Sequence, residues 1–371
     1  MKSNSRFGLF LGVLSAGLAV TACTDNNNTR PIDGTGIQPV SNTKPDWGPT
    51  IDPQNQAVIE QLMAFGTPPL PTLTPRQARM TPSPTDAVKT LLRKNNIQVR
   101  ERAVSISQRV IPGAAPDGTL LRIYTPTSAS VAGGFPVIVY YHGGGWVIGS
   151  LTQYEPSCKA LAEKAGAVVV SVNYRLSPEA KFPAAHEDAY SAYAWVKNNT
   201  ALLGGNTAKI AVAGESAGGN MAAAVCLLAK ERGLALPVHQ LLVYPVADNN
   251  LNTASYNQYA NAMPLNRAGI VYFTQNYFTS PADGDNRLIS LVDVANLTGL
   301  PPATIIAAEI DPLQTEGKLL ADKFKAAGVP VMYQLYTGTT HEFFSLDAIV
   351  GKAGQAQDFA AQQLKAAFAK N

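Results

Sequence analysis

Short apolar runs rich in Val, Ile and Ala alternate with longer stretches of helical periodicity over most of this chain. Such runs are typical of buried strands, and the periodicity between them is typical of helices that pack on a sheet. We predict parallel strands at residues 137–141, 167–173, 210–214, 240–244, 304–310 and 332–336, an antiparallel opening pair at 104–111 and 120–124, and a closing amphipathic helix at 355–370. The alternation predicts an α/β fold with a mostly parallel, doubly wound sheet.

The first residues have the pattern of an export signal. Basic residues precede an apolar run at 7–20, which is too short to favour a membrane-spanning helix. The run leads into the sequence Val-Thr-Ala-Cys ending at Cys23, which resembles the lipobox of bacterial lipoproteins. We therefore predict a signal peptide at residues 1–22 and a lipid on Cys23 that anchors the protein to a membrane of the bacterial cell envelope. An ordinary signal cleaved near Ala22, and hence a secreted protein, is the alternative.

Two segments of different composition follow the export signal. Residues 23–50 are rich in Asn, Thr, Pro and Gly, which is typical of a disordered tether. Residues 51–103 are amphipathic and contain many prolines, and the runs at 57–63 and 87–92 have helical periodicity. We assign the folded domain to residues 51–371.

Composition and charge narrow the classes of function. The chain has 371 residues, 46% of them apolar, and a net charge of +3 without a cluster of Lys and Arg, so nucleic-acid binding is not indicated. His, Cys, Asp and Glu show no metal-ligand spacing. Cys158 and Cys226 fall in predicted helices, where packed thiols are the default, and a disulfide between them stays open.

The most informative motif is the sequence Gly-Glu-Ser-Ala-Gly centred on Ser216. A predicted strand enters it and a small-residue run with helical character leaves it, which is the context of a nucleophile elbow. Gly214 and Gly218 supply the small residues that such a tight turn demands. Ser216 is therefore the candidate nucleophile, although the pentapeptide alone would also fit an ordinary Gly/Ser loop.

A second glycine motif lies upstream. Gly143, Gly144 and Gly145 follow His142 directly after the predicted strand at 137–141. Glycines there leave backbone N–H groups close to a bound molecule, and acyl transfer needs such donors because its tetrahedral intermediate carries a negative oxygen. An HGGG-type segment is a source of the oxyanion hole in lipases and esterases. With an elbow downstream, a merely flexible turn is the weaker interpretation.

A nucleophilic serine needs a base, and the chain has only four histidines. His142 belongs to the glycine loop. His186 is expected at a helix start and His239 at a strand entrance, where structural roles account for them. His341 comes last in the chain, after a predicted strand and a loop at 337–340, and is the candidate base.

The base in turn needs an orienting carboxylate. Asp311 directly follows the predicted strand at 304–310. The order Ser216, Asp311, His341 is the order in which α/β-hydrolases carry their catalytic triad. Asp311 in a simple turn and His341 in a surface loop are the alternatives, and the chain order argues against both together.

From about residue 104 to its C-terminus the chain resembles the bacterial hormone-sensitive-lipase-like esterases, an α/β-hydrolase group. The motifs that carry the resemblance are His142-Gly143-Gly144-Gly145, Tyr174-Arg175-Leu176-Ser177-Pro178-Glu179 with Phe182-Pro183-Ala184-Ala185, Gly214-Glu215-Ser216-Ala217-Gly218-Gly219, Asp311-Pro312-Leu313 and His341. The resemblance implies a triad of Ser216, Asp311 and His341. It also implies an oxyanion hole formed by N–H groups of Gly144, Gly145 and Ala217, with Gly143 shaping the turn.

The chain departs from this family at two positions near the proposed site. Thr315 stands where the family often has a second aspartate after Asp311. Glu342 stands after His341 where the family usually has glycine. A carboxylate beside the base would raise the pKa of the base or narrow the pocket.

The resemblance further implies a helical cap over the active site, built from about residues 51–103 and 249–280. The second segment is aromatic, as an acyl or alcohol pocket would be, although packing onto the core accounts for most of its rings. The implied activity is that of a serine carboxylesterase that hydrolyses short- to medium-chain acyl esters through an acyl-enzyme, without a cofactor.

Two other functions stay open on the same sequence. One is an amide or acetyl-carbohydrate hydrolase with the same triad. The other is a non-catalytic binding or receptor protein, as found among relatives that lost the histidine, whereas this chain keeps His341. The expected partners are a small-molecule ester and, through the lipid on Cys23, a membrane; a homodimer is also left open.

Overall fold

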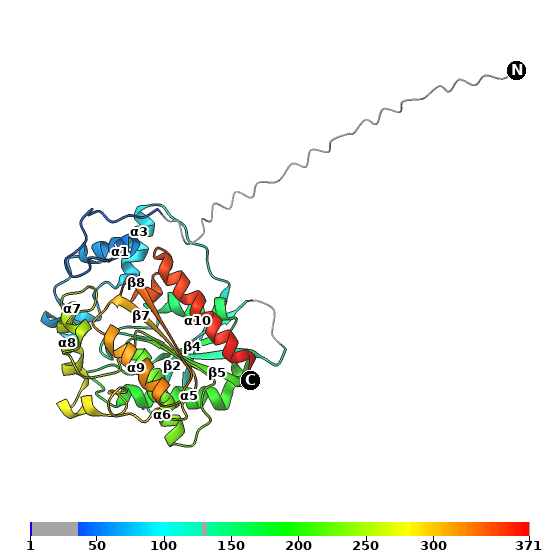
Figure 1. Cartoon of the computed structure of the whole chain (residues 1–371). Coiled ribbons are helices and arrows are strands. Elements are labelled where there is room, and N and C mark those ends of the chain that lie inside the picture. Colours follow the sequence, from blue (N-terminus) through cyan, green and yellow to red (C-terminus); the bar gives the residue numbers. More distant parts are fainter. Residues whose placement is uncertain (2–35, 128–131, 371) are drawn as a thin grey trace.

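An eight-stranded sheet runs through the centre of the protein (Figure 1), whose computed structural model describes Met1 and residues 36–127 and 132–370. The spatial order is β1-β2-β4-β3-β5-β6-β7-β8. The strands are β1 (Val104–Ile111), β2 (Thr119–Pro126), β3 (Phe135–Tyr141), β4 (Val168–Asn173), β5 (Gly205–Glu215), β6 (Gln240–Val243), β7 (Ala303–Ile310) and β8 (Val331–Thr340). β2 pairs antiparallel with β1 and β4, and the remaining pairs are parallel. The predicted α/β fold and its antiparallel opening pair are confirmed.

Helices cover both faces of this sheet. The α-helices of the described residues are α1 (Pro53–Met63), α2 (Pro75–Ala78), α3 (Pro84–Lys94), α4 (Glu155–Ala165), α5 (Ala184–Asn199), α6 (Ala217–Glu231), α7 (Ala254–Gln258), α8 (Arg267–Tyr277), α9 (Gln314–Ala326) and α10 (Gly351–Ala369). α4 and α10 pack on one face, and α5, α6 and α9 pack on the other (Figure 1). Along β3, Val137 and Val139 face the second group while Ile138 and Tyr140 face the first, so a strand buried on both faces is apolar throughout.

The predicted element boundaries shift where contacts beyond the local sequence decide them. Residues 337–340, which we expected to form a loop, continue β8, because Thr340 pairs with Ile310 of β7 and Gly338 N–H donates to the Glu309 carboxylate. The closing helix α10 begins at Gly351 instead of residue 355. The extension of β8 places the residue after Thr340 at the edge of the sheet.

Three prolines within residues 51–103 begin the helices α1, α2 and α3. Asp52 caps α1 through a hydrogen bond from Gln54 N–H, and Pro53 is the first residue of the helix. Ser83 and Asp86 form a capping box at the start of α3, again with a proline directly after the cap. Proline suits this position because its missing N–H would have no partner within the helix. The two predicted helices are confirmed, each with an earlier start.

The tether prediction is wrong for residues 36–50, which lie against the folded domain. Ile37 is buried in the cluster that contains Val58 of α1. The backbone N–H groups of Val40 and Ser41 donate to the Glu60 carboxylate. Hydrogen bonds to one carboxylate and one buried side chain therefore order a segment whose composition alone favours disorder.

The N-terminal predictions can be placed only in part. The predicted signal peptide after Met1, the lipidation site Cys23 and the first part of the tether all lie in residues 2–35, outside the described residues. None of the helices in the described part of the chain combines the length and the hydropathy that a membrane span requires.

Cys158 and Cys226 are both free thiols. Cys158 lies on α4 and Cys226 on α6, so the sheet separates them, and no disulfide joins them. Burial raises the pKa of each thiol above its ordinary value. Both therefore act as packed, protonated side chains.

The position of Ile305 in a central strand predicts a large effect of its removal. Ile305 is buried between β7 and the helices of one face, so Ile305→Ala should lower the free energy of unfolding by about 2–5 kcal/mol. Met332 lies on the edge strand β8 and is 50% exposed, so Met332→Ala should change it by less than about 1 kcal/mol. Urea denaturation measures both, and equal effects would contradict this assignment of the core.

Candidate active site

Ser216 occupies a sharp turn between a strand and a helix. β5 ends at Glu215 and α6 begins at Ala217, so Ser216 alone connects them, with a backbone φ of +56°. A side chain on Gly218 would overlap the carbonyl oxygen of Tyr141, and one on Gly214 would overlap Gly218 itself. Close backbone packing thus explains both glycines of the motif. The turn has the strand–turn–helix geometry that the sequence predicted for a nucleophile elbow.

Asp311 and His341 meet because neighbouring strands end beside each other. β7 and β8 pair Ile310 with Thr340, so the residues that follow leave the same edge of the sheet. His341 Nδ1 lies 2.7 Å from Asp311 Oδ2, and Asp311 Oδ1 accepts a hydrogen bond from Leu313 N–H at 2.9 Å. The carboxylate is fully buried and held at both oxygens, so the imidazole ring is oriented from one side.

The glycine loop follows β3 at the same edge. Gly144 and Gly145 have φ values of +105° and +57°, which favour glycine. Both line the cavity that also contains Ser216 and His341. Gly143 packs behind the loop, where a side chain would overlap the hydroxyl of Tyr154.

His142 stabilises this loop from behind. Its Nδ1 lies 2.8 Å from the carbonyl oxygen of Gly143, and the Tyr174 hydroxyl donates to the carbonyl oxygen of His142 at 2.8 Å. Burial lowers the pKa of His142 to about 4, so its ring is neutral at ordinary pH. His142 therefore supports the glycine loop through its contacts.

The remaining histidines lie away from the cavity lining. His186 Nε2 is 2.9 Å from Asn220 Oδ1 and its Nδ1 is 2.7 Å from the Tyr277 hydroxyl. His239 Nε2 is 2.9 Å from Thr304 Oγ1. Burial lowers the pKa of both rings to about 4. His341 is the histidine that shares a cavity with Ser216.

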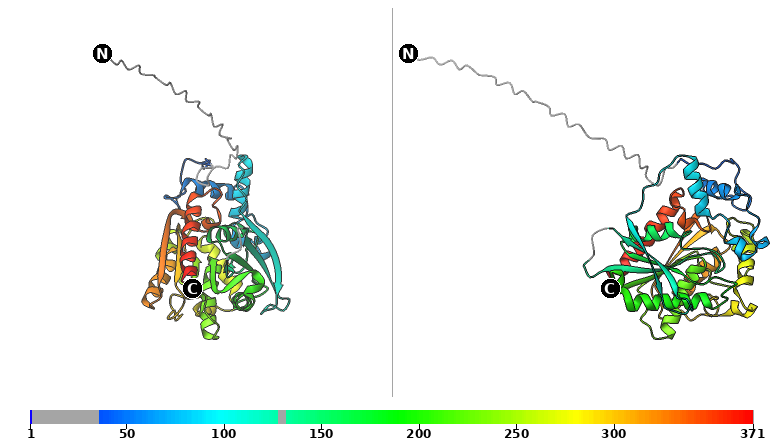
Figure 2. Two further views of the ribbon diagram at one scale, coloured as in Figure 1. Left: turned by 90° about the vertical axis from the view of Figure 1, so that its right-hand side faces the viewer. Right: turned by 180° about the vertical axis from the view of Figure 1, so that it is seen from behind.

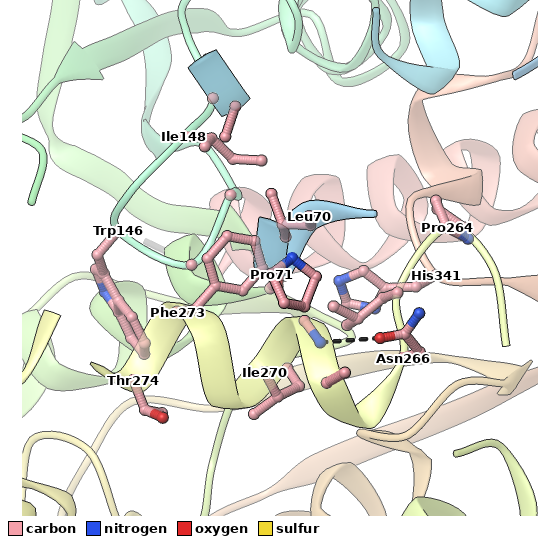
Figure 3. A pocket seen from close by; sticks show the side chains of 18 of the residues that line it. Leu70, Pro71, Trp146, Ile148, Pro264, Asn266, Ile270, Phe273, Thr274 and His341 are labelled. Carbon is pink, nitrogen blue, oxygen red and sulfur yellow. Dashed lines mark hydrogen bonds between the residues drawn. The ribbon is translucent and has the colours of Figure 1, made fainter. Parts of the chain in front are cut away.

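The cavity has a volume of about 1100 Å³ and a mostly apolar wall (Figure 3). The wall comes from the N-terminal segment, with Leu70 and Pro71, and from α8, with Ile270 and Phe273. The two segments pack against each other in one apolar cluster. In Figure 1 and in the right-hand view of Figure 2, the blue N-terminal helices and the yellow-green α7 and α8 lie at the same side of the molecule. The two segments thus adjoin and line one cavity.

The aromatic residues of the second cap segment divide into two groups. Tyr256, Phe273 and Phe278 line the cavity. Tyr277 instead stacks on the ring of Trp146, with ring centroids 4.5 Å apart, and so packs the cap onto the core. The aromatic composition therefore reflects both a pocket wall and ordinary packing.

Sequence reasoning missed a buried carboxyl group next to the elbow. The hydroxyls of Tyr140 and Tyr244 donate to the two side-chain oxygens of Glu215. The Tyr244 ring also lies over the ring of His341, with centroids 4.5 Å apart. Burial, with a further contribution from Glu342, raises the pKa of Glu215 to about 7. The available signal was a tyrosine near the end of each strand that flanks β5.

The two departures from the family pattern make defined contacts. Thr315 Oγ1 accepts a hydrogen bond from Ser255 N–H at 3.2 Å, and Thr315 N–H donates to Ser255 Oγ at 3.1 Å, which joins α9 to α7. Glu342 Oε1 accepts a hydrogen bond from the Tyr154 hydroxyl at 2.7 Å. Glu342 lines the cavity, whereas Thr315 does not.

The charges around His341 set its protonation. Burial alone would lower the pKa of His341, but the negative charge and hydrogen bond of Asp311 raise it, and Glu342 and Glu215 add to this. The net result is a pKa above the ordinary value of 6.5. Within residues 36–127 and 132–370, no group of three or more His, Cys, Asp and Glu is arranged to hold a metal ion.

The sequence of this chain is similar to those of known hydrolases. Residues 138–345 match a family described as having the α/β-hydrolase fold. The chain is 39% identical to carboxylesterase NlhH of Mycobacterium tuberculosis over 251 residues, which cover 67% of this chain and 78% of that protein. It is 34% identical to an ethyl acetate hydrolase of Pseudomonas putida over 236 residues, covering 63% and 74%.

Solved structures show the same relationship in three dimensions. A thermostable esterase from Pseudomonas putida superposes with a TM-score of 0.78 at 34% identity, covering 86% of this chain and 98% of that one. A hyperthermophilic esterase from the archaeon Pyrobaculum calidifontis gives 0.76 at 35% identity, covering 85% and 98%. The overall fold is thus shared with esterases.

The charges near His341 predict its titration. The His341 ring should titrate above 6.5, whereas His142, His186 and His239 should titrate near 4. Glu342→Gly should lower the pKa of His341, because a negative neighbour that favours the imidazolium is removed. NMR titration of the imidazole rings, assigned with single His→Gln variants, measures both. An upward shift in Glu342→Gly would contradict this account of the electrostatics.

Proposed function

The chain belongs to the α/β-hydrolase family, in its hormone-sensitive-lipase-like esterase group, and we propose that it is a serine carboxylesterase for short- to medium-chain acyl esters. One observation carries the proposal: Ser216, on its elbow, shares a cavity with His341, whose ring is hydrogen-bonded to the buried Asp311. Esterase relatives at 34–39% identity support the reaction class.

The proposed mechanism proceeds through an acyl-enzyme. His341 accepts the proton of the Ser216 hydroxyl as its oxygen attacks the ester carbonyl carbon. Asp311 holds the ring so that Nδ1 carries a proton and the other nitrogen faces the reaction, and it stabilises the imidazolium. The imidazolium then donates its proton to the leaving alcohol. Water, deprotonated by the same histidine, attacks the acyl-enzyme, and the acid and free Ser216 result.

The negative oxygen of each tetrahedral intermediate needs hydrogen-bond donors. We assign this role to the N–H groups of Gly144, Gly145 and Ala217, with Gly143 packed behind the turn. The positive φ values of Gly144 and Gly145 and their position on the cavity wall support the assignment. Rigid donors of this kind cost no reorganisation when charge develops, which makes them effective in catalysis.

The cavity supports an ester with an apolar acyl or alcohol group. Leu70, Leu265, Ile270 and Phe273 contribute apolar surface to its wall. Such a wall offers few partners for the hydroxyls of an acetylated carbohydrate, so that alternative is less favoured. The hydrogen bond that orients His341 argues against a non-catalytic receptor.

We further propose that a lipid on Cys23 anchors this esterase to a membrane of the bacterial cell envelope. The support is the lipobox-like sequence at Cys23 after a short apolar run. Residues 36–50 lie against the domain, so the tether would comprise at most residues 24–35. Secretion after ordinary cleavage near Ala22 is the alternative. The homodimer that the sequence left open can be tested by sedimentation analysis.

Loss of the nucleophile tests the proposed function. Ser216→Ala should lower kcat for p-nitrophenyl esters by roughly 10^4-fold or more without unfolding the protein. Assays with acetate, butyrate and longer esters would also give the chain-length preference, which we expect to peak at short to medium chains. Ser107→Ala, the same change at an exposed position of β1, is the matched control and should leave activity unchanged. Near-normal activity of folded, uncontaminated Ser216→Ala would refute the proposal.

Metabolic labelling tests the proposed location. The wild-type protein should incorporate labelled palmitate and fractionate with membranes, because the acyl chains would be attached at Cys23. Cys23→Ser should abolish both, while Cys158→Ser should abolish neither, since Cys158 is buried in the domain. Absence of label from the wild-type protein would refute the lipid anchor and favour a secreted or periplasmic esterase.

A further inference from the structure

A hydrogen bond joins two loops of the site that are far apart in sequence. Tyr154, at the start of α4, donates its hydroxyl to Glu342, the residue after His341, at 2.7 Å. Both side chains line the same cavity as Ser216. Neither residue belongs to the proposed triad or to the proposed oxyanion donors, so the site contains a polar contact that the mechanism above does not use.

Tyr154 also contacts the loop that carries the proposed oxyanion donors. A Cβ atom on Gly143 would overlap the Tyr154 hydroxyl, so this hydroxyl lies directly against the loop. The Tyr154 ring stacks on the ring of His142, with centroids 5.7 Å apart and planes inclined by 29°. Tyr154 is only 5% exposed and has little freedom to move away. One phenol therefore touches the glycine loop and holds the residue next to the base.

The backbone of Glu342 adopts a conformation that favours glycine. Glu342 has φ +70° and ψ +2°, a left-handed conformation in which glycine is free of strain and other residues are not. Glycine would therefore fit the backbone better, and what glutamate adds is its carboxylate. Non-glycine residues in strained conformations concentrate at functional sites, and the same holds here for Ser216 and Tyr244.

We propose that Tyr154 and Glu342 are positioning residues. Their hydrogen bond fixes the distance and orientation between the loop that carries His341 and the glycine loop. The inference rests on the proposed esterase function. In the reaction, His341 must reach Ser216 while the loop N–H groups reach the developing oxyanion, so small errors in the spacing of the two loops reduce the rate steeply. The substrate is already bound before this alignment matters, and the effect therefore falls on kcat more than on KM.

Two kinds of change separate the hydrogen bond from the charge of Glu342. Tyr154→Phe removes the donor and keeps the ring that stacks on His142. Glu342→Ala removes the acceptor and the charge, whereas Glu342→Gln keeps an oxygen that accepts the hydrogen bond and removes the charge alone. Burial raises the pKa of Tyr154 well above its ordinary value, so the phenol remains a donor across the pH range of an assay.

The expected result is a set of related rate losses. Tyr154→Phe and Glu342→Ala should each lower kcat on p-nitrophenyl acetate by roughly tenfold, with KM changed by less than about twofold. The double variant should lose no more than the worse single variant, because both changes remove the same contact. Glu342→Gln should recover most of the loss seen in Glu342→Ala. Tyr190→Phe, on α5 beside Arg232 and away from the cavity, is the matched control.

A pH profile separates positioning from electrostatics. Three carboxyl groups influence His341, namely Asp311, Glu342 and Glu215, and the Tyr244 ring packs on it. Glu342→Gln should move the acid limb of kcat/KM to lower pH, since only the charge is removed, while keeping most of the plateau kcat.

Several outcomes would overturn the inference. A kcat of folded Tyr154→Phe within twofold of the wild type would do so, as would losses that multiply in the double variant. Equal plateau losses in Glu342→Gln and Glu342→Ala would also contradict it. If Tyr154→Phe fails to fold, the plateau kcat values of Glu342→Gln and Glu342→Ala still test the proposed role of the hydrogen bond. A wild-type protein inactive on all esters would instead refute the proposed function itself.

Discussion

Backbone hydrogen bonds between parallel strands bring the functional groups of this protein together. Because β5, β7 and β8 run in the same direction, their carboxyl ends lie at one edge of the sheet. Ser216, Asp311 and His341 each directly follow one of these strands. The pairing of β7 with β8 continues to their last residues, Ile310 and Thr340. This register places the imidazole of His341 within hydrogen-bond distance of the Asp311 carboxylate. A shift of the register would separate them, since each residue of a strand advances the chain by about 3.3 Å.

Close backbone packing at this edge leaves no space for side chains at several positions. Gly218 lies against the carbonyl oxygen of Tyr141, and Gly145 lies against the ring of Phe273 in the cap. The absence of side chains at these glycines therefore allows the elbow to contact the end of β3 and allows Phe273 to contact the glycine loop. The same packing brings Phe273 over the glycine loop, so the cap and the proposed oxyanion donors form one continuous wall of the cavity.

Carboxyl groups surround His341 on more than one side. Asp311 holds its ring, and Glu342 follows it in the chain. Glu215 accepts a hydrogen bond from Tyr244, whose ring packs on the imidazole. Each carboxyl has hydrogen-bond donors, so their burial is compensated. The combined field raises the pKa of His341 against the opposing effect of burial. The environment of His341 is thus set by residues on β3 and β5, at the start of α4, and directly after β6, β7 and β8.

The sequence alone determined the alternation of strands and helices, the elbow at Ser216, the glycine loop and the candidate order of Ser216, Asp311 and His341. These features depend on local physics: apolar runs that fill a buried strand, and glycines where backbones approach closely. Tertiary structure decided the rest. Residues 36–50 are ordered by Glu60, and residues 337–340 become a strand by pairing with β7.

Tertiary structure also decided the partners of the buried carboxyls. The tyrosines that bind Glu215 lie on β3 and directly after β6, the two strands that flank β5. Tyr154 and Glu342 are separated by 188 positions in the chain. The sheet keeps Cys158 and Cys226 on opposite faces, although both lie in helices as expected from the sequence. The local sequence pattern reflects the secondary structure that neighbouring residues favour. Contacts between distant segments depend instead on how the whole sheet and its cap pack together.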